Sequence, residues 1–211
     1  MPLFKTINFN PSTQILVWKI TESYEELFHD VQLSEKSLQR LHGMKSELHQ
    51  RGFLSVRKLL QEAGYNDFDL YYDESGKPYL QNGKFISISH SFRFSTIIIS
   101  DQKAGIDIEM QREKILKIAD KFVNNKELQR LQSFDNQDYI KKLTTKWGAK
   151  EAVFKIRNEK GISFKHHIQV SPFEIVDKKT TAILEIENTK QQFSIYFEEV
   201  EDFILVYTFE N

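Results

Sequence analysis

The spacing of apolar residues predicts a strand and a long helical region in the first third of the chain. Residues 14–20 (QILVWKI) are rich in β-branched and aromatic side chains, a composition typical of a strand. Between residues 34 and 63, leucines and other apolar residues recur at helical spacing, so we expect helix throughout this segment. Gly64 is placed to end the helix. Residues 73–78 (DESGKP) have the composition of a turn.

The rest of the chain alternates between strand-like and helix-like stretches. Short β-rich runs predict strands at residues 85–90, 94–100, 105–110, 181–187, 193–199 and 203–209. Helical periodicity covers residues 115–157. This order indicates an α+β fold with two similar halves, residues 1–104 and 105–211, although no residue-by-residue repeat links them.

Composition allows a sizeable core and narrows the choice of partner. Hydrophobic residues form 40% of the 211 residues, with 17 Phe and 8 Tyr among them. The 29 Lys and Arg nearly balance the 30 Asp and Glu, so the net charge of −1 gives no general attraction to nucleic acid or to an anionic membrane. The absence of cysteine excludes disulfides, thiolate catalysis and Cys-based zinc sites. Because we find neither a signal peptide nor an apolar run long enough to span a membrane, we expect a cytoplasmic protein.

Two carboxylates lie two residues apart in the strand predicted at residues 105–110. Alternate residues of a strand point to the same face, so Asp107 and Glu109 share one face while Ile106 and Ile108 share the other. Neighbouring carboxylates repel unless a cation or a proton relieves them, and Mg²⁺ prefers carboxylate, phosphate and water oxygens. A magnesium site and the solvated outer face of an edge strand are both compatible with this pair.

A second charged pattern lies near the end of the second helical region, in residues 147–155 (WGAKEAVFK). Glu151 and Lys155 are four positions apart, so on a helix they share a face with Trp147. An ordinary surface ion pair beside a core aromatic residue explains this pattern as well as a functional site does.

Two further segments each carry one candidate ligand. His90 is flanked by Ser89 and Ser91 at the end of a predicted strand, where it could donate a hydrogen bond to a phosphate or serve only in packing. A nucleophilic pair of Ser89 and His90 is not expected, because adjacent strand residues point to opposite faces. Lys77 adds one exposed cation in the turn Gly-Lys-Pro.

Together and in this order, the four segments resemble a known family. Gly-Lys-Pro, Ser-Ile-Ser-His-Ser, Gly-Ile-Asp-Ile-Glu and Trp-Gly-Ala-Lys-Glu-Ala-Val-Phe-Lys are similar to motifs of the 4′-phosphopantetheinyl transferase superfamily. The resemblance covers residues 33–165 and rests mainly on the last two motifs, while the chain length resembles the long surfactin-synthetase-activating type. It implies a pseudo-dimer of two α+β halves with the active site in the cleft between them.

The resemblance also implies a reaction. The family transfers 4′-phosphopantetheine from coenzyme A to a serine of an apo acyl or peptidyl carrier protein, requires Mg²⁺ and releases adenosine 3′,5′-bisphosphate. By this resemblance Asp107, Glu109 and Glu151 would ligate Mg²⁺. Lys155 and Lys150 would contact the coenzyme A phosphates, and Glu151 and Lys155 would be catalytic. The expected partners are coenzyme A and a carrier protein, with no nucleic acid and no membrane, and we expect a monomer.

The nucleotide end of coenzyme A would be bound by residues of the first half. The resemblance places Lys77, Ser89 and His90 near the adenine nucleotide. His90 and Arg51 would contact its 3′-phosphate, and Lys36 aligns with a further phosphate-binding lysine.

Glu127 has two interpretations. In Asn-Asn-Lys-Glu, Asn124 followed three residues later by Glu127 is the pattern of a capping box at the start of a helix. The resemblance instead implies a catalytic glutamate at this position, near the metal and its water, where it would help to remove the serine proton.

The chain departs from the family pattern, and two other functions stay open. Gly148 stands where the family usually has Ser or Thr, and residues 156–161 match its Gly-rich loop imperfectly. The same carboxylates would suit another Mg²⁺-dependent phosphotransferase, although the lack of a P-loop counts against an ATP-using kinase. A catalytically silent, carrier-protein-binding domain of the same fold is the second alternative.

Overall fold

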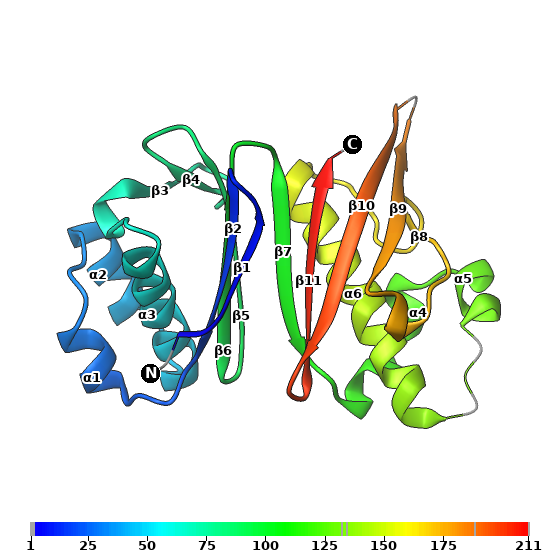
Figure 1. The fold of residues 1–211 in the computed structure, drawn as a ribbon, viewed down its shortest axis with the longest axis horizontal. Coiled ribbons are helices and arrows are strands. Elements are labelled where there is room, and N and C mark those ends of the chain that lie inside the picture. Colours follow the sequence, from blue (N-terminus) through cyan, green and yellow to red (C-terminus); the bar gives the residue numbers. More distant parts are fainter. Residues whose placement is uncertain (1–2, 132, 134, 188, 211) are drawn as a thin grey trace. The chain divides into compact units, whose positions relative to one another are not determined.

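The computed structural model describes residues 3–131, 133, 135–187 and 189–210 (Figure 1). The chain divides into two compact units, Met1–Asp101 and Gln102–Asn211, and we describe each by itself. Each unit combines helices with antiparallel strands, which confirms the α+β class. The division lies a few residues before the boundary expected from the sequence.

The first unit consists of a sheet, a small hairpin and three α-helices (Figure 1). Its strands are β1 (Leu3–Asn10), β2 (Thr13–Lys19), β3 (Leu70–Tyr72), β4 (Pro78–Leu80), β5 (Phe85–Ser91) and β6 (Phe94–Ser100). Its helices are α1 (Tyr24–His29), α2 (Glu35–His42), α3 (Glu47–Glu62) and the short 3₁₀ helix η1 (Asp67–Asp69). Four strands form an antiparallel sheet in the order β1-β2-β6-β5, and β3 pairs with β4.

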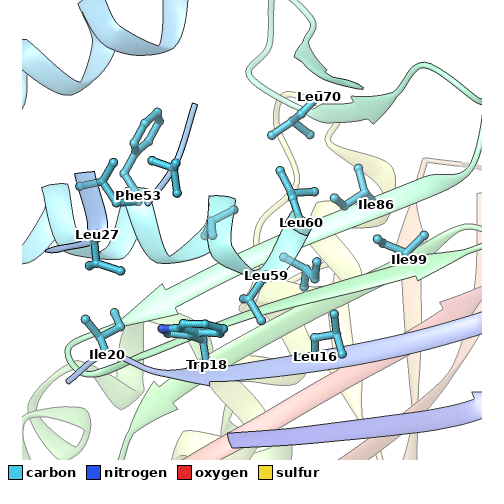
Figure 2. Close-up of a cluster of buried hydrophobic side chains, with 14 of the residues drawn as sticks. Leu16, Trp18, Ile20, Leu27, Phe53, Leu59, Leu60, Leu70, Ile86 and Ile99 are labelled. Atoms are coloured by element: carbon cyan, nitrogen blue, oxygen red, sulfur yellow. The ribbon is translucent and has the colours of Figure 1, made fainter. Parts of the chain in front are cut away.

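The core of the first unit lies between α3 and this sheet. Leu59 and Leu60 of α3 lie over Leu16 and Trp18 of β2 (Figure 2), and all four side chains are at most 2% exposed. Full burial of one such side chain contributes about 1.5–3 kcal/mol. The amphipathic spacing of α3 is therefore what holds the helix on the sheet.

The prediction of helix throughout residues 34–63 is wrong in one respect, because this segment forms two helices, α2 and α3. Gly43 ends α2 with its N–H donated to the Gln39 carbonyl oxygen, and Ser46 has an extended backbone before α3 begins. Apolar spacing does not reveal this break, since both helices bury the same kind of face. Gly64 does end α3, with a φ of +81°.

The second unit consists of one antiparallel sheet and a long helix (Figure 1). Its strands are β7 (Ala104–Met110), β8 (Ile168–Val170), β9 (Lys179–Ile186), β10 (Thr189–Val200) and β11 (Phe203–Glu210). They lie in the order β7-β11-β10-β9-β8, so β7 is an edge strand. Its helices are α4 (Ala119–Phe122), α5 (Asn125–Arg130), α6 (Asn136–Arg157) and the 3₁₀ helices η2 (Glu113–Ile118) and η3 (Ile175–Asp177).

Helix α6 covers one face of this sheet and packs mainly on β7 and β11. Ala149 and Val153 are fully buried in the same apolar cluster as Ile204 and Val206 of β11. The helical region expected at residues 115–157 is thus divided into η2, α4, α5 and α6, because Val123 and Asp135 take extended backbone conformations. In the part of the chain that the structure describes, no helix is both long and apolar enough to cross a membrane.

Candidate functional site

The carboxylates predicted from the sequence lie on the edge strand of the second unit. Asp107 is only 3% exposed, so its interpretation as part of a solvated strand face is wrong. Ile106 and Ile108 are fully buried. Glu109 follows on the same strand and is half-buried. Strand β7 therefore carries a buried carboxylate next to a partly accessible one.

Lys155 joins α6 to this strand. Its Nζ lies 2.9 Å from Asp107 Oδ1 and donates a second hydrogen bond to the Ile106 carbonyl oxygen at 2.8 Å. The side chain of Asp107 is 4% exposed and that of Lys155 is 26% exposed, so water screens this pair far less than a surface pair. Lys155 therefore forms an ion pair with a carboxylate of β7. On α6 it also lies four residues after Glu151.

Glu151 belongs to the same electrostatic neighbourhood. Burial raises the pKa of its carboxyl to about 7, and the carboxylates of Asp107 and Glu109 act in the same direction against the opposing effect of Lys155. A buried carboxyl near two others favours a proton or a cation. The α6–β7 contact therefore concentrates negative charge beside one lysine.

The donor chemistry of this cluster fits a hard divalent cation, but the side chains are not gathered into a finished site. Asp107, Glu109 and Glu151 offer only carboxylate oxygens, the ligands that Mg²⁺ prefers. Among the described residues, no three Asp, Glu or His side chains are grouped so that they could hold a metal ion as they stand. In this conformation the Lys155 ammonium serves as the cation at Asp107.

Two glycines allow α6 to approach the sheet at this point. A Cβ at Gly105 would lie 1.9 Å from the Ala152 carbonyl oxygen, which no side chain can occupy. A Cβ at Gly148 would lie 2.8 Å from Val206 Cγ2 and 3.4 Å from Asp107 Oδ2. A side chain at position 148 would crowd Val206, so the close packing of α6 on β11 explains why this chain has glycine where the family usually has Ser or Thr.

A pocket opens beside the carboxylates. It has a volume of about 180 Å³ and is lined by residues including Glu109, Thr144 and Trp147. Trp147 is half-buried and packs edge-on against Phe122, with ring centroids 5.1 Å apart. The tryptophan of the motif is therefore both a packing residue and part of the pocket wall.

The capping box predicted at Glu127 is confirmed. The Glu127 N–H donates to Asn124 Oδ1 at 2.9 Å, and the Asn124 N–H donates to Glu127 Oε2 at 3.3 Å. The carboxylate does more than cap α5, because it also receives Lys150 Nζ at 2.8 Å, Lys146 Nζ at 3.4 Å and the Val170 N–H at 3.1 Å. Glu127 is 6% exposed, so it is the buried counterion of two lysines.

Lys150, which the sequence predicts at the coenzyme A phosphates, is engaged within the second unit in this structure. Lys150 is fully buried, and its ammonium donates to Glu127 and to three carbonyl oxygens at 2.7–2.9 Å. Those acceptors belong to Phe122, Phe164 and Ile168, from three separate segments. An ammonium with its donors engaged in this way holds the unit together and has none to offer a ligand.

Lys146 was missed in the sequence, and its titration leads to a testable expectation. Burial lowers its pKa to about 8, although Glu127 opposes this change. Between pH 8 and about 10.4 the native state then holds fewer protons than the unfolded state, so the free energy of unfolding should rise with pH. Urea denaturation of wild type and Lys146→Met at pH 8 and pH 10 checks this. Wild type should gain stability relative to the variant, and equal changes in both would contradict the assignment.

In the first unit, His90 contacts Gly52, the residue that follows Arg51 in the sequence. His90 is exposed near the end of β5 and packs on Gly52, where a Cβ would lie 2.8 Å from His90 Nδ1. Gly52 directly follows Arg51 on α3. Arg51 Nε is buried, and no acceptor among the described residues receives it. A buried guanidinium nitrogen in this state suits an anion supplied by a ligand.

The other nucleotide-binding candidates lie at separate points of the first unit. Lys77 lies in the turn between β3 and β4, where its N–H donates to Asp73 Oδ1 at 3.0 Å. Ser89 lies on β5 and is half-buried. Lys36 is exposed on the first turn of α2. Ser89 directly precedes His90 on β5, whereas Lys77 and Lys36 lie on other elements.

The fold and the site define an α+β protein in which an edge strand and a long helix carry three carboxylates and a lysine that act on one another electrostatically. A sequence model of the 4′-phosphopantetheinyl transferase superfamily matches residues 103–208, which include β7 and α6. The chain is also 30% identical over 148 residues to "4'-phosphopantetheinyl transferase gsp" of Aneurinibacillus migulanus. That alignment covers 69% of this chain and 60% of the relative's length. The chain belongs to the 4′-phosphopantetheinyl transferase superfamily.

Proposed function

We propose that this protein transfers the 4′-phosphopantetheine group of coenzyme A to a serine hydroxyl of an apo carrier protein, in a Mg²⁺-dependent reaction that releases adenosine 3′,5′-bisphosphate. The observation that carries the proposal is the contact of α6 with β7, which places Glu151 near Asp107 and Lys155 against Asp107. The family to which the chain belongs supports the same reaction.

Three carboxylates would hold the metal. Asp107 and Glu109 come from β7 and Glu151 comes from α6, so the ligands rest on two rigid elements. When bound, Mg²⁺ supplies electrostatic stabilisation of the diphosphate that becomes the leaving group. Lys155 would then contact the phosphates, because its ammonium already lies at the carboxylate cluster.

Glu151 couples the metal site to pH. Its carboxyl has a pKa of about 7 in the metal-free chain, so Mg²⁺ would displace a proton when it binds near neutral pH. We assign Glu127 of α5 a positioning role, because it forms ion pairs with Lys146 and Lys150. Both lysines belong to α6, the helix that carries Glu151. The carrier serine would approach through the pocket lined by Glu109 and Trp147.

The nucleotide end of coenzyme A would be bound by the first unit. Arg51 and His90 would contact the 3′-phosphate, with the buried Arg51 Nε as the main support. Lys77, Ser89 and Lys36 would lie around the rest of the nucleotide.

The 3′-phosphate contact predicts a loss of discrimination in His90→Ala. Wild type should use coenzyme A with an apparent affinity about tenfold tighter than 3′-dephospho-coenzyme A, as expected when a charge-assisted hydrogen bond is lost. The variant should show a clearly smaller ratio, measured as the two apparent KM values. His166→Ala, which removes an exposed histidine of the second unit, is the matched control. An unchanged ratio in His90→Ala would leave His90 a purely structural role.

A panel of apo carrier proteins tests the reaction and separates it from the alternatives. Each carrier is incubated with the protein, coenzyme A and Mg²⁺, and its intact mass is measured. A gain of one phosphopantetheine group on any carrier supports the transferase. Binding of a carrier without a mass gain would identify a silent carrier-binding domain. Phosphoryl transfer to another acceptor would indicate a different phosphotransferase.

A further inference from the structure

A second pocket in the second unit is lined by none of the three carboxylates that would hold the metal. It has a volume of about 290 Å³ and shares no lining residue with the pocket beside Glu109. Its wall is formed by α5, α6 and the segment that contains β8 and the residues after it. We call it the basic pocket, after four of its lining residues, Lys126, Arg130, Lys142 and Lys146.

The charges around the basic pocket do not cancel. Lys142 pairs with two carboxylates, Asp138 at 2.9 Å and Glu174 at 2.7 Å, so this group keeps one excess negative charge. Lys146 shares the single carboxylate of Glu127 with the buried Lys150, so this buried group keeps one excess positive charge.

The net charge of the pocket comes from the two exposed cations. Lys126 and Arg130 form no ion pair within the part of the chain that the structure describes. Both line the same pocket as Lys146. The two excess charges of the buried groups cancel, so Lys126 and Arg130 leave the pocket with a net positive charge of two, a potential that concentrates anions.

Lys146 presents a buried ammonium group to the pocket. Its side chain is 3% exposed, and within the described residues its ammonium has two acceptors, Glu127 at 3.4 Å and the Val170 carbonyl oxygen at 2.9 Å. An ammonium has three N–H donors, so one donor is available to a bound molecule. Phe173 lies beneath it at 5.7 Å and contributes an apolar wall.

Without a bound anion, the charged form of Lys146 is destabilised by its surroundings. Burial is the main cause that lowers its pKa to about 8, and Lys150 and Arg130 lower it further while Glu127 opposes them. An anion bound among these cations would offset the desolvation and the repulsion together. The volume is that of a small-molecule site at the lower end of the usual range of about 300–1,000 Å³.

We propose that the basic pocket binds a phosphate group, either as the free ion or as part of a small phosphate monoester. Lys146 would donate from the buried side, and Arg130 and Lys126 would close over the anion from the exposed side. The pocket is distinct from the Asp107 cluster, so this inference does not depend on the proposed transferase activity.

The test is an amide NMR titration of the full chain with inorganic phosphate at constant ionic strength, with chloride as the reference anion. Saturable shifts are expected at Asn124, Val170 and Ser171, which line the pocket. A second titration with glycerol 3-phosphate distinguishes the two sources of the group. Tighter binding of the ester assigns the pocket to a metabolite, and equal binding assigns it to the free ion.

Two variants make the test specific. The double substitution Lys126→Gln and Arg130→Gln removes two exposed charges without touching the buried ion pairs, and it should weaken the apparent affinity at least about tenfold. Lys190→Gln removes one exposed charge elsewhere in the second unit and should leave the affinity unchanged. Shifts confined to residues near Asp107 or Arg51, or an affinity that the double variant does not change, would overturn the proposal.

Discussion

The Glu127→Gln variant should lose about 3–5 kcal/mol of its free energy of unfolding, the usual cost of removing one partner from a buried ion pair. Glutamine can still accept a hydrogen bond and cap α5, so the sequence alone predicts a loss of less than about 0.5 kcal/mol. The structure changes that expectation, because the substitution leaves the buried Lys146 and Lys150 ammonium groups without a carboxylate. Urea denaturation at pH 7 measures the difference.

A matched double variant separates the ion pair from the cap. Glu127→Gln combined with Lys146→Met removes one of the two stranded charges, and it should recover part of the lost stability. Asn124→Ala removes the capping side chain alone and should cost only about 1 kcal/mol. Near wild-type stability of Glu127→Gln would show that the network stabilises little. Transfer measured on the folded fraction tests its positioning role, which predicts a rate at least about tenfold lower.

The Gly105→Ala variant should be destabilised by at least about 3 kcal/mol, because a single methyl group has no room at this position. Its Cβ would lie 1.9 Å from the Ala152 carbonyl oxygen and 2.8 Å from the Ala152 carbonyl carbon, and both atoms are backbone of α6. The helix must therefore move away from β7. We expect a large drop in the denaturation midpoint together with lost activity, since α6 carries Glu151 and Lys155.

Gly43→Ala is the matched control for this substitution. Gly43 has a φ of −74°, and a Cβ there would lie 3.5 Å from the nearest atom, an ordinary contact. The control should therefore keep the stability of wild type within about 0.5 kcal/mol. Equal stability of Gly105→Ala and Gly43→Ala would contradict the close approach of α6 to β7.

The elements with strong local patterns were predictable, and those that depend on distant partners were not. Strands β5, β6, β7, β9, β10 and β11 follow runs of β-branched and aromatic residues. Strand β8 was missed because it has only three residues and is held by pairing with β9. The break between α2 and α3 was missed because helical spacing continues on both sides of Gly43.

The candidate site shows the same limit. The motif residues of β7 and α6 were found from the sequence, and the buried state of Asp107 follows from the strand's contact with α6. The partner of Lys155 was not predictable, since Asp107 lies 48 residues away in the sequence. Lys150 was assigned to a ligand because only its charge was visible, whereas its four acceptors come from segments spread over the second unit. The spacing of Lys146 and Lys150 on one helix face was the available signal that a buried carboxylate serves both.

The most direct test of the account is the intact mass of an apo carrier protein after incubation with coenzyme A, Mg²⁺ and either wild type or Asp107→Asn. Wild type should add one phosphopantetheine group, and excess chelator should stop the reaction until Mg²⁺ is restored. Asp107→Asn should add none over the same time, because the substitution removes a carboxylate from the cluster with Glu151. Asp120→Asn, an exposed aspartate of α4, should behave as wild type. Full transfer by Asp107→Asn, or by wild type in excess chelator, would contradict the account.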